Sequence, residues 1–498
     1  MGLKNYLKID QFSIDEKFLT FVLILSLGLI LFNNLSGSDL PSFDDAYYAQ
    51  KAKEILSTGD LFTLHYGGVP RFDNTPFYIW LIALMFKLFG INEYNARFFS
   101  TVSCLGSMVS LFFIARIISK NKWVRFFSVF VLATTFWYTR YAMHAMFDVT
   151  LSFFYTLIIL FFLLGITKSE RYFLLSGIFV GFSILTKSLL GIFPWIIMVL
   201  FLLFYDSKKL LSRYFLLSIL VSSVIALPWY LVEYFKYGER FVSEQFRWLF
   251  FERAFGKSVP GQNLFSYFYY IKFLLIGYLP WFPLGIAGIY TIIKRKREKK
   301  EDWLELLPII WILTVLVIMT IPGSRKSWYI MPVFPAFALV VGKYLSENIL
   351  KTEKRNFLFA KILSLTFFGI ILILLFFPIP IKSRTFKDLS KMAPVIKRAV
   401  PKEQKVNCFA MEFWYANNSF LFYTDRMLKE PVNDIDSLKR IMEPEDEYCY
   451  MKTKDYESYF KDNKKEFPII AGTKKYVCMT NERTYRKLSN YNFLDFEK

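Results

Sequence analysis

The stretch Phe18–Phe32, FLTFVLILSLGLILF, decides the class of fold. It contains no charged residue, and with the residues up to position 35 it is long enough to cross a lipid bilayer. No signal-peptide cleavage pattern follows it, so we expect the run to remain in the protein as a membrane anchor.

The composition extends this interpretation to the whole chain. Hydrophobic residues make up 55% of the sequence, aromatic residues 20%, and the mean hydropathy is +0.35. These values are typical of a polytopic membrane protein and exclude an ordinary soluble domain. A net charge of +20 could suit a nucleic-acid-binding protein, but the basic residues lie in short loops between apolar runs, where the positive-inside rule puts them. We therefore expect a membrane bilayer, and no nucleic acid, as a partner.

The loop charges predict the topology. The apolar runs suitable for spanning are 18–35, 97–118, 124–141, 147–167, 171–187, 189–206, 213–235, 266–290, 304–321, 328–347 and 357–378. Basic clusters lie at 116–125, 168–171, 208–213, 294–300 and 351–355. All five fall on one side if the short run 76–90 is an interfacial or re-entrant helix. The sequence thus predicts an all-α polytopic membrane domain of about eleven spans. Its first outer loop, 36–96, would lie outside the cytoplasm.

The tail has a different character. Residues 379–498 are rich in Lys, Asp and Glu, with expected strands at 406–410, 447–451 and 476–479 and expected helices at 435–442 and 456–460. We therefore predict two domains, a membrane domain over 1–378 and a small extracytoplasmic α/β domain over 379–498. Cys408, Cys449 and Cys478 fall in this tail, where one disulfide bond is possible and a third thiol would be left over.

The first outer loop opens with Phe43–Gln50, FDDAYYAQ, which places two adjacent carboxylates beside the first span. An anchor does not need them, and phospholipid phosphates would repel them unless a cation or a polarised nucleophile is held there. Capping of the next helix by Asp44 or Asp45 is the structural alternative. Asp73 follows in the same loop, just before the short apolar helix, where Asn74 and Thr75 could serve as the cap.

The order of these motifs resembles the first outer loop of the lipid-linked-sugar transferases of the glycosyltransferase C superfamily. The closest resemblance is to the bacterial lipid A aminoarabinose transferases, and a more distant one is to the protein O-mannosyltransferases. It covers roughly residues 10–350. The later motifs that fit in order are Arg140-Tyr141 with Asp148, Leu185-Thr186-Lys187, Leu279-Pro280-Trp281 and Ser324–Pro332.

The resemblance implies roles for individual residues. Asp44 takes the place of the catalytic aspartate, with Asp45 beside it in the substrate site. Tyr48 takes that of a cavity tyrosine, and Asp148 that of a second active-site carboxylate. A carboxylate at the mouth of a span is costly unless it is paired. Arg140 is its expected partner, and a purely structural Arg140–Asp148 pair is the alternative.

The resemblance implies only part of a metal site. Asp73 replaces a glutamate that helps to bind a metal in the aminoarabinose transferases, and Asn74 stands where that family has a lysine. The family's metal-binding histidine has no clear counterpart, and only Glu252 could serve in its loop. Asp73 and Glu252 without an imidazole make a poor zinc site and a better magnesium-like one. The one cofactor expected is therefore a magnesium-like divalent cation.

The predicted reaction is transfer of a sugar from a polyprenyl phosphate donor, with inversion in a direct displacement. Departure of the phosphate needs fixed positive charge, for which Lys187, Arg325 and Lys326 are candidates; binding of lipid headgroups is the alternative role for these residues. Asp44 would accept the proton of an acceptor hydroxyl or orient the attacking oxygen. Tyr329 is either a cavity wall or an interfacial aromatic.

The sequence thus predicts a multi-pass glycosyltransferase of the bacterial inner membrane with its active site on the extracytoplasmic side. The expected acceptor is lipid A, another glycolipid or a glycan. One alternative is an enzyme like the protein O-mannosyltransferases, acting on Ser or Thr of exported proteins. Another is a transporter or flippase of lipid-linked sugars, which would be expected to carry its charges at the midplane or to show inverted repeats.

Overall fold

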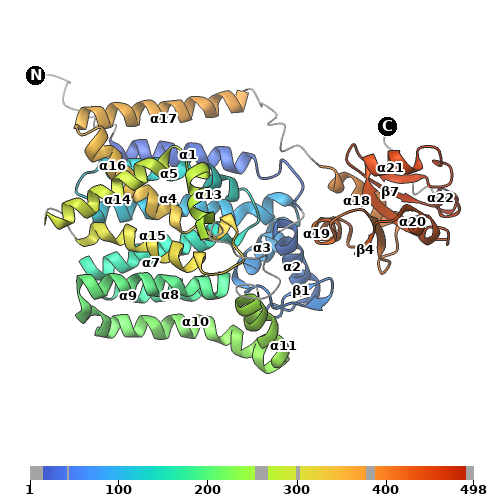
Figure 1. Ribbon diagram of the computed structural model, residues 1–498, viewed down its shortest axis with the longest axis horizontal. Coiled ribbons are helices and arrows are strands. Elements are labelled where there is room, and N and C mark those ends of the chain that lie inside the picture. Colours follow the sequence, from blue (N-terminus) through green and yellow to red (C-terminus); the bar gives the residue numbers. More distant parts are fainter. Residues whose placement is uncertain (1–14, 42–43, 253–266, 299–302, 377–386, 490–498) are drawn as a thin grey trace, which may run out of the picture.

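The computed structural model describes residues 15–41, 44–252, 267–298, 303–376 and 387–489, and it has two parts (Figure 1). One is a bundle of long helices lying side by side, and the other is a small α/β unit at one end of that bundle. The main helices of the bundle are α1 (Glu16–Asn33), α4 (Glu93–Ile118), α5 (Trp123–Ala133), α7 (Phe147–Thr167), α8 (Tyr172–Lys187), α9 (Phe193–Tyr205), α10 (Arg213–Tyr237), α14 (Trp281–Arg297), α15 (Leu307–Thr320), α16 (Val333–Tyr344) and α17 (Glu353–Phe376).

The predicted count of eleven spans is not confirmed. Seven helices in the described part of the chain are long and apolar enough to cross a membrane, or eight if α13 (Tyr269–Gly277) and α14, a pair bent by 113° at the break between them, form one span. Several bundle helices are short: α5 has 11 residues and α16 has 12. At about 1.5 Å per residue such helices are less than about 20 Å long, whereas the hydrocarbon core of a bilayer is about 30 Å thick.

The helical stretch Tyr172–Tyr205 has 34 residues, but it folds back on itself. Ser188 has a φ of 35°, in the left-handed region, and begins the 3-10 turn η1 (Ser188–Ile192). A Cβ atom at Gly191 would collide with the backbone of Ser183 and Ile184. In a straight helix, residues about seven positions apart in the sequence are separated by about 10 Å. The chain therefore reverses at Ser188, and α8 and α9 run as separate helices.

Small residues allow α8 and α10 to approach closely. A Cβ atom at Gly177 would overlap the backbone of Ser218, and one at Gly181 would overlap the side chain of Ile225. Close backbone approach through glycine is a common way to pack membrane helices, since lipid supplies no hydrophobic drive between them.

Two short helices lie at the end of the bundle that faces the α/β unit, called the α2 end below (Figure 1). These are α2 (Asp44–Thr58) and α3 (Phe77–Phe89), joined by the hairpin β1 (His65–Tyr66) and β2 (Val69–Pro70). The helix α3 begins after Pro76 and ends at Gly90, whose φ is 86°. It has 13 residues, and so the run predicted at 76–90 is a short helix and no full crossing.

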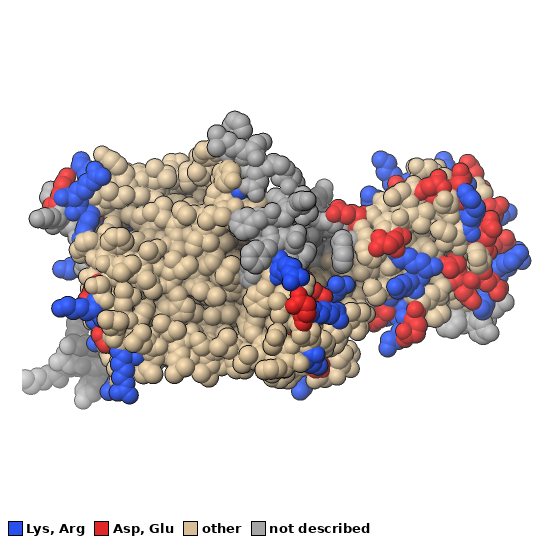
Figure 2. Space-filling view, turned by 60° about the horizontal axis from the view of Figure 1, so that its bottom comes forward, with Lys and Arg blue, Asp and Glu red and all other residues tan. Residues whose placement is uncertain are grey.

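The surface of the bundle matches a membrane protein. Figure 2 shows a broad belt without charged side chains between two charged ends. Lys and Arg gather at the end of the bundle away from the α/β unit, while that unit carries mixed charge. The motifs of the first outer loop thus lie opposite the basic end, as the loop charges predict.

The C-terminal unit is a five-stranded sheet with helices on both faces. Its strand order is β4 (Leu428–Val432), β3 (Val406–Phe409), β5 (Tyr448–Lys452), β7 (Tyr476–Thr480) and β6 (Ile469–Gly472). The pairs β4–β3 and β3–β5 are parallel, and the pairs β5–β7 and β7–β6 are antiparallel. Five helices complete it: α18 (Leu389–Ala399), α19 (Phe413–Thr424), α20 (Ile435–Ile441), α21 (Thr453–Phe460) and α22 (Glu482–Ser489). The three strands and two helices predicted here are confirmed. The predicted boundary at 378 falls outside the described residues.

The sheet keeps its three cysteines too far apart or on opposite faces for an internal disulfide. All four cysteines of the chain are free and buried. Cys408 and Cys478 both pair with Tyr450 on the central strand, so two strand spacings, about 9–10 Å, separate them. That exceeds the Cα separation of about 7 Å that a disulfide can bridge. Cys449 belongs to the core on the other face of the sheet.

The α/β unit is joined to the first outer loop by α19, which packs on α2. The hydroxyl of Tyr423 accepts from the backbone N–H of Leu40 at 2.8 Å and donates to Glu93 at 2.9 Å. Lys53 donates to the carbonyl of Phe422 at 2.7 Å. The buried side chain of Phe422 belongs to the same apolar core as α2 and α3. Part of the tail therefore completes the core of the first outer loop.

Candidate functional site

The first two residues of α2 lie in different environments. Asp44 is half-buried, and Tyr48 follows it one turn later on the same face of the helix. Asp45 is 2% exposed, and its Oδ2 lies 3.7 Å from Nε of Arg97 and 3.1 Å from Nδ1 of His144. A helix turns by about 100° per residue, so neighbouring side chains cannot share a face. Both acids also suit the positive end of the helix dipole.

Asp45 is part of a buried structural network. Its partner Arg97 is 3% exposed and donates to the carbonyls of Leu35, Ser38 and Asp39 at 2.6–2.9 Å. These bonds tie the start of α2 to α4 and to the end of the first helix. This network holds α2 in place, and the substrate-binding role predicted for Asp45 stays a prediction.

A second carboxylate lies at the mouth of the bundle. Asp148 is the second residue of α7 and is 1% exposed; it forms an ion pair with Lys187, the last residue of α8, through a short contact between Oδ1 and Nζ. The ammonium also lies 4.8 Å from the ring centre of Phe147 and 4.4 Å from that of Tyr329. Such contacts stabilise a partly desolvated cation.

Arg140 is not the partner of Asp148. It lies on α6 (Phe136–Tyr141), is exposed, and stacks over the rings of Phe136 and Trp137 at 5.8 Å and 5.4 Å. The expected Arg140–Asp148 pair is therefore wrong. The turn after α6 leads the chain away before α7 begins, and Lys187 reaches the carboxylate from α8 instead.

Aromatic contacts join the face of α2 that carries Asp44 to the Asp148–Lys187 pair. Tyr48 is buried, and its ring lies 4.8 Å from the ring of Phe147. Phe147 precedes Asp148 and also contacts Lys187. We call Tyr48, Phe147, Asp148, Lys187 and Tyr329 the Asp148 cluster. All members of this cluster except Phe147 were predicted for the site, and the structure brings them together. Asp44 lies one helical turn before Tyr48.

Asp73 has a different setting. Its Oδ1 accepts from Nζ of Lys51 at 2.6 Å, and its Oδ2 accepts from the hydroxyl of Tyr47 at 2.9 Å. Lys51 also donates to Oδ1 of Asn74 at 2.8 Å. Burial alone would raise the pKa of Asp73, but the ammonium of Lys51 and the two hydrogen bonds hold that pKa below its ordinary value. Asp73 is thus an ionised carboxylate with a fixed counterion.

The residues around Asp73 do not fit the predicted cation. Both of its carboxylate oxygens are engaged by donors, and among the described residues no three His, Cys, Asp or Glu side chains gather as a metal site. Glu252 ends the π-helix η3 (Ser243–Glu252), and its side chain lies outside the described residues. The magnesium-like cation stays a prediction.

Arg325 and Lys326 lie in the turn after α15. Nε and Nη2 of Arg325 both donate to the carbonyl of Thr320, at 3.0 Å and 2.7 Å, and its guanidinium lies 4.8 Å from the ring of Tyr267. Arg325 therefore satisfies a carbonyl at the end of α15. Lys326 lies 6.0 Å from the ring of Trp328. The phosphate-binding role of both residues stays a prediction.

Sequence reasoning missed Lys51 and Arg97, the buried cations that pair with Asp73 and Asp45. The signal for Lys51 was its spacing: it follows Tyr47 by four residues and lies within the buried stripe of Tyr48, Ala52 and Ile55. A lysine on the buried face of a helix needs a partner. Its partner Asp73 lies 22 residues away, which local periodicity does not reveal.

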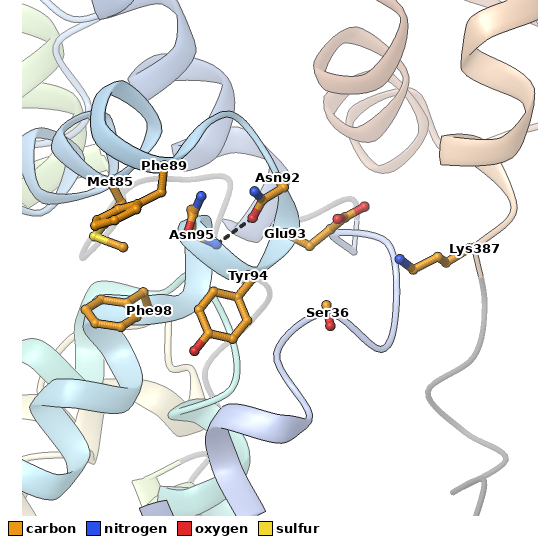
Figure 3. Close-up of a pocket in the computed structure, with 9 residues that line it drawn as sticks. All are labelled: Ser36, Met85, Phe89, Asn92, Glu93, Tyr94, Asn95, Phe98 and Lys387. Atoms are coloured by element: carbon orange, nitrogen blue, oxygen red, sulfur yellow. Dashed lines mark hydrogen bonds between the residues drawn. The ribbon is translucent and has the colours of Figure 1, made fainter. Parts of the chain in front are cut away.

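A separate cavity of about 550 Å³ lies at the α2 end (Figure 3). Met85, Phe89 and Phe98 form its apolar wall, and Glu93 and Lys387 lie at its polar edge. Among the side chains that the structure describes, none of those predicted for the site lines it. It is therefore distinct from the Asp148 cluster.

Sequence comparisons find one matching family model and several similar proteins. A family model described as dolichyl-phosphate-mannose-protein mannosyltransferase matches residues 73–231, the part that contains Asp73, Asp148 and Lys187. The chain is 27% identical over 357 residues to an uncharacterized protein of Aquifex aeolicus, covering 71% of this chain and 68% of that one. It is 24% identical over 313 residues to an undecaprenyl phosphate-alpha-4-amino-4-deoxy-L-arabinose arabinosyl transferase of Proteus mirabilis, covering 60% of this chain. The match spans only 54% of that transferase.

Solved structures show the same fold. ArnT from Cupriavidus metallidurans bound to undecaprenyl phosphate matches with a TM-score of 0.68 and 18% identity, covering 92% of this chain and 97% of that one. The predicted resemblance to the aminoarabinose transferases is confirmed. The archaeal oligosaccharyltransferase AglB from Archaeoglobus fulgidus is more distant, with a TM-score of 0.53, 13% identity and coverage of 88% and 70%. A coverage of 92% has to include most of the C-terminal unit, so the structural likeness extends beyond the membrane bundle.

Proposed function

We propose that the protein is an integral membrane glycosyltransferase that moves a sugar from a polyprenyl phosphate donor to an acceptor at the α2 end of the bundle. One observation carries the proposal: the Asp148–Lys187 pair lies at a helix mouth, contacts two aromatic rings, and adjoins the helix that begins with Asp44. A buried ion pair at the end of a span is costly to maintain and marks function more often than anchoring.

The chemistry assigns a part to each group. The bond between the anomeric carbon and the phosphate oxygen breaks, and the phosphate keeps the electron pair. The ammonium of Lys187, between the rings of Phe147 and Tyr329, would stabilise the charge that develops on the leaving phosphate. The acceptor oxygen forms the new bond from the opposite face, which inverts the anomeric centre.

Asp44 would take the proton if the acceptor is a hydroxyl. If the acceptor is a phosphate oxygen, no proton is lost and Asp44 orients the attacking group. Asp148 would keep Lys187 charged and in place, because a lysine near an apolar site otherwise tends to lose its proton. Tyr48 would form part of the wall between the two carboxylates.

The proposed location is the bacterial inner membrane, with the α2 end and the C-terminal unit on the extracytoplasmic side. The charge pattern of the loops supports this orientation, since the basic end lies opposite the site. The likeness to aminoarabinose transferases favours lipid A or another glycolipid as the acceptor. The family model over residues 73–231 favours a second candidate, transfer to Ser or Thr of exported proteins.

The test uses membranes containing the full chain and a radiolabelled polyprenyl phosphate sugar. Lys187→Met should lower transfer about 10²–10³-fold, the usual loss when one charge-stabilising donor is removed. The control is Lys209→Met, which breaks a more exposed lysine–carboxylate pair, with Glu170 at 3.2 Å, at the basic end of the bundle. Transfer by this control should stay near normal.

The fate of the label separates the candidates. Label in glycolipid supports the first acceptor class, and label in protein supports the second. Label that stays on the polyprenyl phosphate but crosses the membrane would identify a flippase and refute the proposal. Equal loss of transfer in both lysine variants would remove Lys187 from the reaction.

A further inference from the structure

Lys51 is a lysine enclosed by the protein. Its side chain is 0% exposed, and it lies on α2 among buried apolar residues such as Tyr48, Ala52 and Ile55. Nζ is surrounded by Oδ1 of Asp73 at 2.6 Å, Oδ1 of Asn74 at 2.8 Å and the ring of Tyr47 at 4.3 Å. An enclosed charge destabilises a fold unless it is paired and hydrogen-bonded, and here it is both.

The atoms around this ammonium form the kind of donor set that a hard divalent cation would take. Carboxylate and amide oxygens are typical ligands of magnesium or calcium, at about 2.0–2.6 Å. Oδ1 of Asp73 and Oδ1 of Asn74 converge on one point, and the nitrogen of Lys51 occupies it. A divalent ion bound to the same two oxygens would be within a few ångströms of the ammonium, and like charges at that distance repel strongly.

The position of Lys51 also bears on the reaction. It lies seven residues after Asp44, which is two helical turns along the same face of α2. Its bonds to Asp73 and Asn74 fix that face against the segment before α3. The hydrogen bond from Tyr47 to Asp73 adds a second tie between the same two segments.

We propose that the ammonium of Lys51 takes the place of a bound divalent cation at Asp73 and positions α2, with Asp44 at its start, without a metal. Lys51 is a positioning residue in this account, since it acts through α2. Its effect on catalysis rests on the proposed transfer function, whereas the exclusion of metal does not.

The first measurement needs no activity. The purified full-length wild type is assayed for bound metal by mass spectrometry, and its thermal unfolding is followed with and without a chelator and with added MnCl₂. We expect bound metal well below one ion per chain and a melting temperature that neither treatment shifts. Stoichiometric zinc, magnesium or manganese whose removal lowers the melting temperature would overturn the proposal.

The second measurement removes the ammonium. Lys51→Ala leaves the oxygens of Asp73 and Asn74 facing a vacated position, so MnCl₂ should raise its melting temperature in a saturable way. If manganese has no effect on this variant, the oxygens do not form a cation site and the proposal fails. Should Lys51→Ala not fold, the wild-type metal analysis still decides the question.

The third measurement separates positioning from general stability. Lys51→Met should lower kcat at least about 10-fold, and Lys51→Arg should restore most of it, because a guanidinium can keep charge-assisted hydrogen bonds to both oxygens. The matched control is Lys53→Met on the same helix, whose lysine pairs with Asp425 of the C-terminal unit at 2.5 Å. Equal kcat losses at positions 51 and 53 would refute the positioning role. Absence of transfer in the wild type would refute the proposed function and leave the metal result standing.

Discussion

Replacing Asp44 and Asp45 by asparagine, one at a time, should give opposite results in two assays. The two residues are adjacent, yet Asp44 begins α2 on the face that carries Tyr48, while Asp45 is buried against Arg97 and His144. We expect Asp44→Asn to keep the fold and lose transfer. Asp45→Asn should lose stability first, and transfer only to the extent that α2 moves.

The magnitudes follow from burial and distance. Asp45 and Arg97 are 2% and 3% exposed, with N and O at 3.7 Å. Removing one charge of a buried pair costs about 3–5 kcal/mol. Arg97 keeps its three carbonyl acceptors and asparagine keeps an oxygen near His144, so about 3 kcal/mol is expected. At Asp44 the change removes a charge from a helix N-terminus, a loss that costs about 0.3–1 kcal/mol, whereas transfer should fall about 10²–10⁴-fold.

The buried thiols provide the stability assay. All four cysteines are free and buried, so a thiol-reactive dye reports unfolding without further engineering. Asp45→Asn should become labelled at a clearly lower temperature than wild type, and Asp44→Asn at nearly the same temperature. Near-normal transfer by folded Asp44→Asn would return Asp44 to helix capping and refute the reasoning. Wild-type melting of Asp45→Asn would show that the buried pair does not hold α2.

Four further predictions test other contacts. Arg325→Ala should weaken use of the donor more than use of the acceptor; if only the melting temperature changes, Arg325 is no more than the cap of its helix. Asp73 has a lowered pKa, so its ion pair stabilises the fold fully above the ordinary aspartate range and less as the pH falls through it. The melting-temperature advantage of wild type over Asp73→Asn should thus be present at pH 7 and shrink toward about pH 3; a constant advantage would contradict this. Tyr423→Phe should cost about 1–3 kcal/mol in the dye assay, since a backbone donor and a carboxylate lose their partner. In intact cells, an impermeant reagent should label a cysteine at Thr58 but not one at Glu298, and the reverse would invert the proposed orientation.

Much of the fold could be predicted from the sequence because the signals are local. An apolar run long enough to span a bilayer needs no knowledge of its neighbours, and the strands of the tail show their own short patterns. The number of spans could not be settled in this way. The reversal at Ser188 falls between the predicted runs 171–187 and 189–206, as expected, but α5 and α16 are shorter than the predicted runs 124–141 and 328–347.

Partners within the site were harder to predict, because they come from distant parts of the chain. Arg140 is eight positions from Asp148, and on sequence alone it was the natural partner. Lys187, 39 residues away, reaches the carboxylate because α7 and α8 pack side by side. Which of two basic residues pairs with a carboxylate depends on helix packing, and helix packing leaves little trace in the spacing of charges.

The same reasoning applies to the division of the chain into a membrane domain and a tail. The tail has its own sheet and core, as its composition predicts, yet Phe422 fills part of the core of α2 and α3. The hydroxyl of Tyr423 satisfies the backbone of Leu40, just before the helix that begins with Asp44. A buried donor without its acceptor destabilises the structure around it. Removing the tail would therefore leave the first outer loop with an open core and unpaired polar groups. The site at the start of α2 thus depends on residues more than 350 positions away in the sequence.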